Sequence, residues 1–194
     1  RQKDRSMKLE LRGITKRFGA LVANDHIDLT VAPGEIHCLL GENGAGKSTF
    51  IKILAGAQRQ DEGTLRLFGR EVDFSSPAEA MKAGIGVVYQ ELSNFPELDV
   101  AANLFPNRKG GAILNHNATY RAAREKLDAA GLFNVDERAM MGDLSLGQQQ
   151  MGEIARLIGE DVRVVILDEP TSALTEADAE ILFSLIDLMK ARGI

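Results

Sequence analysis

The segment that most constrains this chain of 194 residues is a glycine-rich loop at residues 41–48. Its sequence, Gly-Glu-Asn-Gly-Ala-Gly-Lys-Ser, fits the pattern G-x-x-x-x-G-K-[ST]. A short apolar run at residues 36–40 precedes it and predicts a strand, and a helix is expected from about Lys47 to about Gly56. Glycines allow a tight loop whose backbone N–H groups, together with the positive end of the helix, face an anion. In this context a phosphate-binding loop is favoured over a chance glycine-rich turn.

A second apolar run, at residues 164–167, is followed by two carboxylates. The run predicts a strand buried in a parallel sheet. Asp168 and Glu169 follow it directly, and ligands of open α/β sheets bind at the carboxyl ends of strands. A solvated turn is the alternative, but the phosphate loop in the same chain disfavours it. We therefore expect Asp168 and the Ser48 hydroxyl to hold Mg²⁺. Lys47 is expected to reach the β- and γ-phosphates and Glu169 to act as general base toward the attacking water, so the two motifs predict a nucleoside triphosphatase.

Composition predicts a soluble, cytoplasmic protein. Lys and Arg number 23 against 28 Asp and Glu, and the resulting net charge of −5 argues against a nucleic-acid partner. The single cysteine, Cys38, excludes an internal disulfide framework and fits a reducing compartment. No apolar run approaches the roughly 18 residues of a membrane span, and the first residues show no signal-peptide pattern.

The order of predicted elements indicates an α/β sandwich with a helical insert. Residues 92–159 have helical character, whereas strands and helices alternate on either side of them. The strand candidates are residues 8–14, 26–31, 36–40, 64–67, 85–89 and 164–167. The helix candidates are residues 47–56, 77–83 and 118–130, and a last helix that Thr175 opens with a capping box.

Four motifs in sequence order resemble those of the ATP-binding cassette (ABC) family. They lie at residues 41–49, 89–91 (Tyr-Gln-Glu), 144–150 (Leu-Ser-Leu-Gly-Gln-Gln-Gln) and 167–175. The resemblance implies an α/β P-loop NTPase (RecA-like) fold, whose core sheet has an antiparallel β edge and an inserted α-helical subdomain. It also implies hydrolysis of ATP with Mg²⁺. The expected domains are a tail at residues 1–6, an ATP-binding core at residues 7–91 and 161–194, and a helical subdomain at residues 92–160.

The resemblance assigns roles to individual residues. The implied catalytic residues are Lys47, Gln90 and Glu169, and the implied metal ligands are Ser48, Gln90 and Asp168. The implied nucleotide-binding residues are Phe18, Gly41, Asn43, Gly44, Ala45, Gly46, Lys47, Ser48 and Thr49. Phe18 stands where the family stacks an aromatic ring on adenine, although a lone phenylalanine is as often a core residue. The signature residues Ser145, Gly147 and Gln148 would clamp the γ-phosphate of ATP held by an opposite cassette, although Ser145 by itself is also a simple helix cap.

Within the family, the sequence is most similar to importers of monosaccharides such as ribose, galactose and xylose. The resemblance rests on Leu146 in the signature, where the general family has glycine, and on residues 90–93, 96–98 and 151–156. It implies the N-terminal cassette of an importer, peripheral on the inner face of the cell membrane. The implied partners are transmembrane permease subunits and, indirectly, a periplasmic or extracellular sugar-binding protein. A second cassette, fused in the same full-length chain, would form a head-to-tail dimer with this one. Thr175 departs from the family, which usually has aspartate there, and this weakens the expected coupling across the dimer.

Other functions are also compatible with parts of the sequence. The family's switch histidine follows the last helix, whereas the three histidines here all precede residue 164, so weak ATP hydrolysis by this chain alone is expected. A soluble cassette ATPase of translation is disfavoured because Ser172 and Ala173, not Asn-His, follow the Glu-Pro-Thr segment. The 98 positions from Lys47 to Ser145 (145 − 47 = 98) leave no room for the coiled coil of a chromosome ATPase. A non-catalytic nucleotide-binding regulatory module is disfavoured by Glu169.

Overall fold

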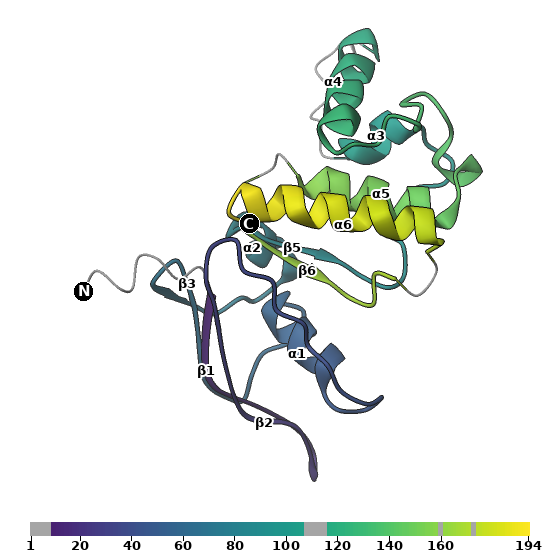
Figure 1. Ribbon diagram of the computed structural model, residues 1–194. Helices are drawn as coiled ribbons and strands as arrows, with labels where there is room; N and C mark the ends of the chain where they lie inside the picture. Colours follow the sequence, from purple (N-terminus) through teal and green to yellow (C-terminus); the bar gives the residue numbers. More distant parts are fainter. Residues whose placement is uncertain (1–8, 107–115, 159–160, 172–173) are drawn as a thin grey trace. The chain divides into compact units, whose positions relative to one another are not determined.

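The computed structural model describes residues 9–106, 116–158, 161–171 and 174–194 (Figure 1). The predicted tail at residues 1–6 lies outside these ranges. The chain divides into two compact units. The first comprises Arg1–Val87, Asp161–Asp168 and Lys190–Ile194, and the second comprises Val88–Glu160 and Glu169–Met189.

A four-stranded antiparallel sheet dominates the first unit. Its order is β2-β1-β3-β4. The strands are β1 (Leu9–Phe18), β2 (Leu21–Val31), β3 (Glu62–Leu67) and β4 (Arg70–Val72). Leu9 and Leu11 of β1 alternate with less buried residues and face the core, and Ile14, beyond a register shift in the strand, is fully buried as well. The sequence predicted only the outer halves of the first hairpin, whose strands run on to a turn at Gly19 and Ala20.

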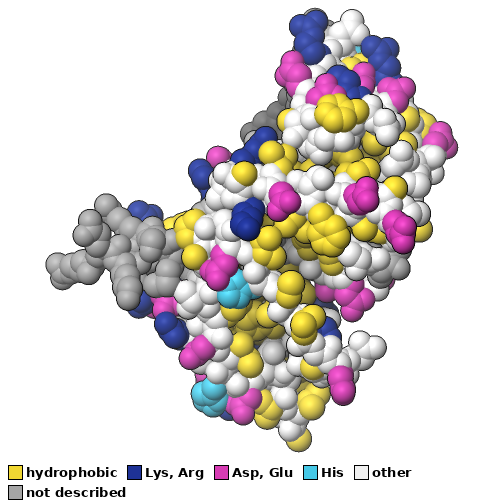
Figure 2. Space-filling model, viewed as in Figure 1, with side chains coloured by type: hydrophobic (Ala, Val, Ile, Leu, Met, Phe, Trp, Pro, Cys, Tyr) yellow, Lys and Arg dark blue, Asp and Glu magenta, His cyan; other side chains and the backbone are white. Residues whose placement is uncertain are grey.

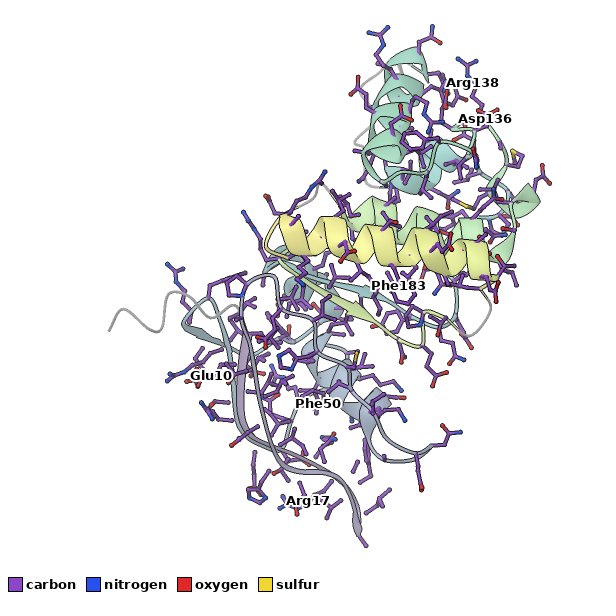
Figure 3. All side chains as sticks on the ribbon, viewed as in Figure 1. Glu10, Arg17, Phe50, Asp136, Arg138 and Phe183 are labelled. Carbon is purple, nitrogen blue, oxygen red and sulfur yellow. The ribbon has the colours of Figure 1, made fainter. Side chains whose placement is uncertain are left out.

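The core of the first unit joins this sheet to helices and to two further strands. Helix α1 (Lys47–Leu54) buries Phe50, Ile53 and Leu54 in the cluster that also holds Leu11 and Leu65. Phe50 projects from α1 toward the strands of the sheet (Figure 3). Helix α2 (Pro77–Lys82) adds Ala80, and the short strands β5 (Ile85–Val88) and β6 (Val164–Leu167) pair with each other.

One predicted strand does not form. Residues 35–40 belong to no helix or strand, and the exposed fractions of Ile36, Leu39 and Leu40 are 53%, 43% and 91%. An apolar run becomes a strand only where it pairs with a neighbouring strand, and the run itself does not specify that partner. Within the described residues, residues 36–40 pair with neither the four-stranded sheet nor the β5–β6 pair.

The second unit is helical. It contains α3 (Val100–Leu104), α4 (His116–Ala129), the 3-10 helix η2 (Met141–Asp143), α5 (Leu146–Leu157) and most of α6 (Glu176–Ala191). Asp99 caps α3 by accepting the Ala102 N–H at 2.7 Å, and it also accepts the Tyr120 hydroxyl of α4 at 2.9 Å. The Lys126 ammonium of α4 donates to the Arg156 carbonyl of α5 at 2.6 Å. Side-chain bonds therefore tie the helices of this unit together.

The surface carries several large apolar side chains. Figure 2 shows hydrophobic side chains interspersed with acidic and basic ones on one face. Phe183 of α6 is one of them, with an exposed fraction of 59% (Figure 3). Among the described residues, no helix combines the length and the apolar character needed to cross a bilayer.

Candidate nucleotide site

The predicted phosphate loop is present and leads directly into α1. Gly44 and Gly46 have φ angles of +86° and +88°, and the Phe50 N–H donates to the Gly46 carbonyl at 2.9 Å in the first turn of the helix. Helix α1 begins at Lys47, as predicted, and has no acidic residue in its first turn. Its positive end is therefore not neutralised locally, which suits an anionic ligand.

The loop is fixed against β2 at Gly46. A Cβ at this position would overlap the Ala23 carbonyl oxygen and would lie 2.8 Å from the Asn24 amide nitrogen, so only glycine fits. The buried Asn24 side chain donates from Nδ2 to the Gly46 carbonyl at 3.2 Å. Sequence reasoning missed Asn24, because the predicted strand began only at His26 and left this asparagine outside it.

The Lys47 side chain closes the loop. Its ammonium donates to the Gly41 carbonyl at 2.6 Å and to the Glu42 carbonyl at 2.9 Å. Residues 41–45 and Ser48 are exposed, and a Cβ built on Gly44 would meet no atom within 4 Å. An ammonium, a hydroxyl and exposed loop backbone at a helix N-terminus form a donor set that fits a nucleotide phosphate chain with Mg²⁺.

The two carboxylates that follow β6 belong to different units. Asp168 ends the β6 segment in the first unit, together with the phosphate loop, whereas Glu169 begins a segment of the second unit. Glu169 has a φ of +46°, in the left-handed region that residues with a Cβ seldom adopt. Such strain persists only where surrounding structure imposes it, and it is typical of functional positions.

The signature residues form the start of α5. The Ser145 Oγ accepts the Gln148 N–H at 3.2 Å, and the Gln148 Oε1 accepts the Ser145 N–H at 3.1 Å, which completes a capping box. Gly147 is buried, and a Cβ at this position would overlap the Asp178 carboxylate of α6, so a side chain does not fit there. Thr175 holds that carboxylate by donating its hydroxyl at 2.8 Å, so the residue that departs from the family pattern contacts the signature through Asp178.

The segment after Gln90 lies against α5. The Ser93 N–H donates to the Glu153 carboxylate at 2.6 Å, and the Asn94 amide donates to the Gln149 carbonyl at 3.2 Å. Glu153 is 2% exposed, and this burial raises the pKa of its carboxyl, while the Ser93 bond opposes the rise. Sequence reasoning assigned Glu153 no role, because one carboxylate among the polar residues of α5 gives no sign of burial.

Phe18 lies in the first unit with Lys47, whereas Gln90 and Glu169 lie in the second. Phe18 ends β1 in the first unit, is 46% exposed, and has the Lys16 ammonium 5.7 Å from its ring centre. Its exposure excludes the alternative of a core residue. Gln90 and the signature residues belong to the second unit together with Glu169. The structure thus brings together the loop residues within one unit and the signature with the segment after Gln90 within the other.

Comparisons with known proteins identify the family. The family profile described as "ABC transporter" matches residues 24–172. Ribose import ATP-binding protein RbsA 1 of Rubrobacter xylanophilus is 48% identical over 190 residues, which cover 96% of this chain and 38% of that protein. The putative ribose/galactose/methyl galactoside import ATP-binding protein 1 of Burkholderia ambifaria is 45% identical over 96% of this chain and 36% of its own length. The chain therefore spans less than two-fifths of these relatives.

Solved structures show the same fold. The ADP conformation of MJ1267, an ATP-binding cassette of an ABC transporter, superimposes with a TM-score of 0.81 at 26% identity, over 97% of this chain and 78% of that one. MJ0796, in a dimeric post-hydrolysis state bound to ADP and Pi, has a TM-score of 0.76 at 26% identity, over 95% and 84% of the two chains. The predicted fold class and the predicted resemblance are both confirmed. This chain belongs to the ABC transporter family and has the fold of its ATP-binding cassettes.

Proposed function

We propose that this chain is the first ATP-binding cassette of a monosaccharide importer, and that it binds and hydrolyses MgATP to drive sugar uptake. The observation that carries the proposal is the loop at residues 41–48, closed by Lys47 and fixed to β2 through Gly46. Family membership supports the ATPase reaction. The import proteins named above support the transport role, and they disfavour a soluble ATPase or a non-catalytic regulatory module.

The phosphate chain is bound by groups of the first unit. Backbone N–H groups of residues 41–46 and the N-terminus of α1 face the phosphates, and Lys47 exchanges its contacts with loop carbonyls for contacts with the β- and γ-phosphates. Ser48 and Asp168 of the first unit would hold Mg²⁺, which supplies positive charge to the phosphate oxygens. The family resemblance adds Gln90 as a further metal ligand. Phe18 stacks on adenine from the end of β1.

Hydrolysis requires groups of the second unit as well. Glu169 accepts a proton from the attacking water, since a carboxylate at the end of a strand can serve as a general base. Ser145, Gly147 and Gln148 at the N-terminus of α5 bind the γ-phosphate of a nucleotide held by an opposite cassette. The reaction site is therefore shared in a head-to-tail dimer, and the MJ0796 cassette, solved as a dimer bound to ADP and Pi, supports dimerisation of such cassettes.

The partners follow from the same proposal. The curated relatives are more than twice as long as this chain, which leaves room for a second cassette in the full-length protein. Permease subunits hold the cassettes at the inner face of the cell membrane, and a sugar-binding protein outside the membrane delivers the substrate to them. Sugar selectivity then resides in these partners.

Reconstituted transport tests the proposed function. Full-length protein with its permease subunits in proteoliposomes is expected to take up a monosaccharide, with ribose, galactose and xylose as the first probes, only when ATP is supplied to the cassette side. Lys47→Ala is expected to lower uptake by at least about tenfold, because charged hydrogen bonds to the phosphates are lost. Radiolabelled sugar measures the rate.

The matched control is Lys52→Ala, which removes an exposed lysine from the last turn of the same helix and should leave uptake unchanged. ATP turnover without ATP-dependent uptake of any of the three sugars would favour the soluble ATPase instead.

A further inference from the structure

Glu153 of helix α5 has a buried carboxylate, although the packing of this helix does not require a charged group there. Its exposed fraction is 2%, and its neighbours in sequence on the helix, Met151, Ile154 and Ala155, are buried apolar residues. Taking a carboxylate out of water is costly unless strong hydrogen bonds compensate, and burial raises the pKa of Glu153 accordingly. An apolar residue at this position would pack α5 without that cost.

The hydrogen bond that Glu153 accepts comes from a different segment. The Ser93 N–H donates to its carboxylate at 2.6 Å, a charge-assisted bond to a backbone group. The adjacent Asn94 amide donates to the Gln149 carbonyl at 3.2 Å, one turn earlier on the same helix. Phe95 is then held by Asn103 of α3, which accepts its N–H at 2.8 Å and donates to its carbonyl at 3.0 Å. Three consecutive residues are thus fixed by side chains or backbone of α3 and α5.

These contacts link two parts of the candidate site. The segment 93–95 begins three residues after Gln90, and α5 begins at the signature, where Ser145 and Gln148 form the capping box. A bond between the segment and α5 makes the position of one depend on the position of the other. Ser93 itself lies in no helix or strand, so its backbone N–H has no regular ladder to hold it.

We propose that Glu153 is a positioning residue, which fixes the segment after Gln90 onto the signature helix so that the two keep one geometry during ATP hydrolysis. This rests on the proposed function, because Gln90 and the signature act only when nucleotide is bound. Glu153 contacts neither nucleotide nor metal in this account. It acts through the Ser93 N–H.

The test compares Glu153→Met with Glu153→Gln in the full-length protein assembled with its permease. Methionine fills a buried helical position but accepts no hydrogen bond, whereas glutamine keeps an acceptor oxygen without the charge. E153M is expected to lower kcat for ATP hydrolysis about tenfold while KM for ATP changes less than about twofold, and E153Q is expected to restore kcat to within about twofold of wild type. Hydrogen–deuterium exchange of a peptide containing Ser93 is expected to accelerate about tenfold in E153M only.

Controls separate this proposal from folding and from the proposed function. Glu125→Met changes an exposed glutamate of α4 and should alter neither kcat nor exchange. Asn94→Ala removes the hydrogen bond to the Gln149 carbonyl without altering a side chain of α5, and it is expected to lower kcat about threefold. This variant replaces E153M in the test if E153M fails to fold. The proposal would be overturned if E153M kept the wild-type kcat, or if E153Q lost as much kcat as E153M. If E153M does not fold, a wild-type kcat in N94A would overturn it. Absence of ATP turnover in the wild-type assembly would instead reject the proposed function.

Discussion

Glu169→Gln in the full-length protein is expected to lower ATP turnover by about 10²- to 10⁴-fold while MgATP binding persists. Glutamine has the shape of glutamate but cannot accept the proton of the attacking water. The backbone of residue 169 already has a φ of +46°, so a substitution of the same size adds no new strain there. Phosphate release measures turnover, and nucleotide retention on the same preparation measures binding.

The matched control is Glu176→Gln in the first turn of α6, which should keep turnover within about twofold of wild type. The assignment of Glu169 as general base would be wrong if E169Q retained turnover within a fewfold of wild type. Loss of binding together with turnover would also contradict it, because the carboxylate would then act in holding the nucleotide.

Gly46→Ala is expected to abolish detectable MgATP binding and to destabilise the chain. The φ of +88° alone costs roughly 1–2 kcal/mol for a residue with a Cβ. The added carbon would also overlap the Ala23 carbonyl oxygen, so the loop must move away from β2 and lose the bond from Asn24. Thermal unfolding without nucleotide and equilibrium nucleotide binding measure the two effects.

Gly19→Ala is the matched control, because Gly19 also has a positive φ, of +60°, but a Cβ there meets no atom within 4 Å. It should show the conformational cost alone, about 1–2 kcal/mol, and bind MgATP normally. Equal stability of the two variants would show that the contact of Gly46 with β2 does not constrain the loop.

The parts of the site that the sequence predicted are those encoded by local pattern. The phosphate loop, the start of α1 at Lys47 and the cap at Ser145 each depend on residues within a few positions of one another. The capping box of α6, with Thr175 and Asp178, is likewise local and was found as predicted. The two motifs predicted the phosphate and Mg²⁺ roles of Lys47, Ser48 and Asp168, and the family resemblance added those of Gln90, Phe18 and the signature. These roles remain predictions for the individual residues.

The parts that the sequence did not predict depend on contacts between distant segments. Asn24 and Gly46 are 22 positions apart, and Ser93 and Glu153 are 60 apart, so no periodicity links them. The strand predicted at residues 36–40 failed for the same reason, since strand formation requires a partner that a local apolar run does not specify. Packing between segments decided each of these cases.

Calorimetric titration of MgATP into the chain and into its Lys47→Ala variant tests most directly whether the loop at residues 41–48 is the nucleotide site. We expect saturable binding at one site per chain, weakened about 100-fold or more in K47A, because the ammonium makes charged hydrogen bonds to the phosphates. No saturable binding by the wild-type chain, or equal affinity in the two proteins, would contradict the account.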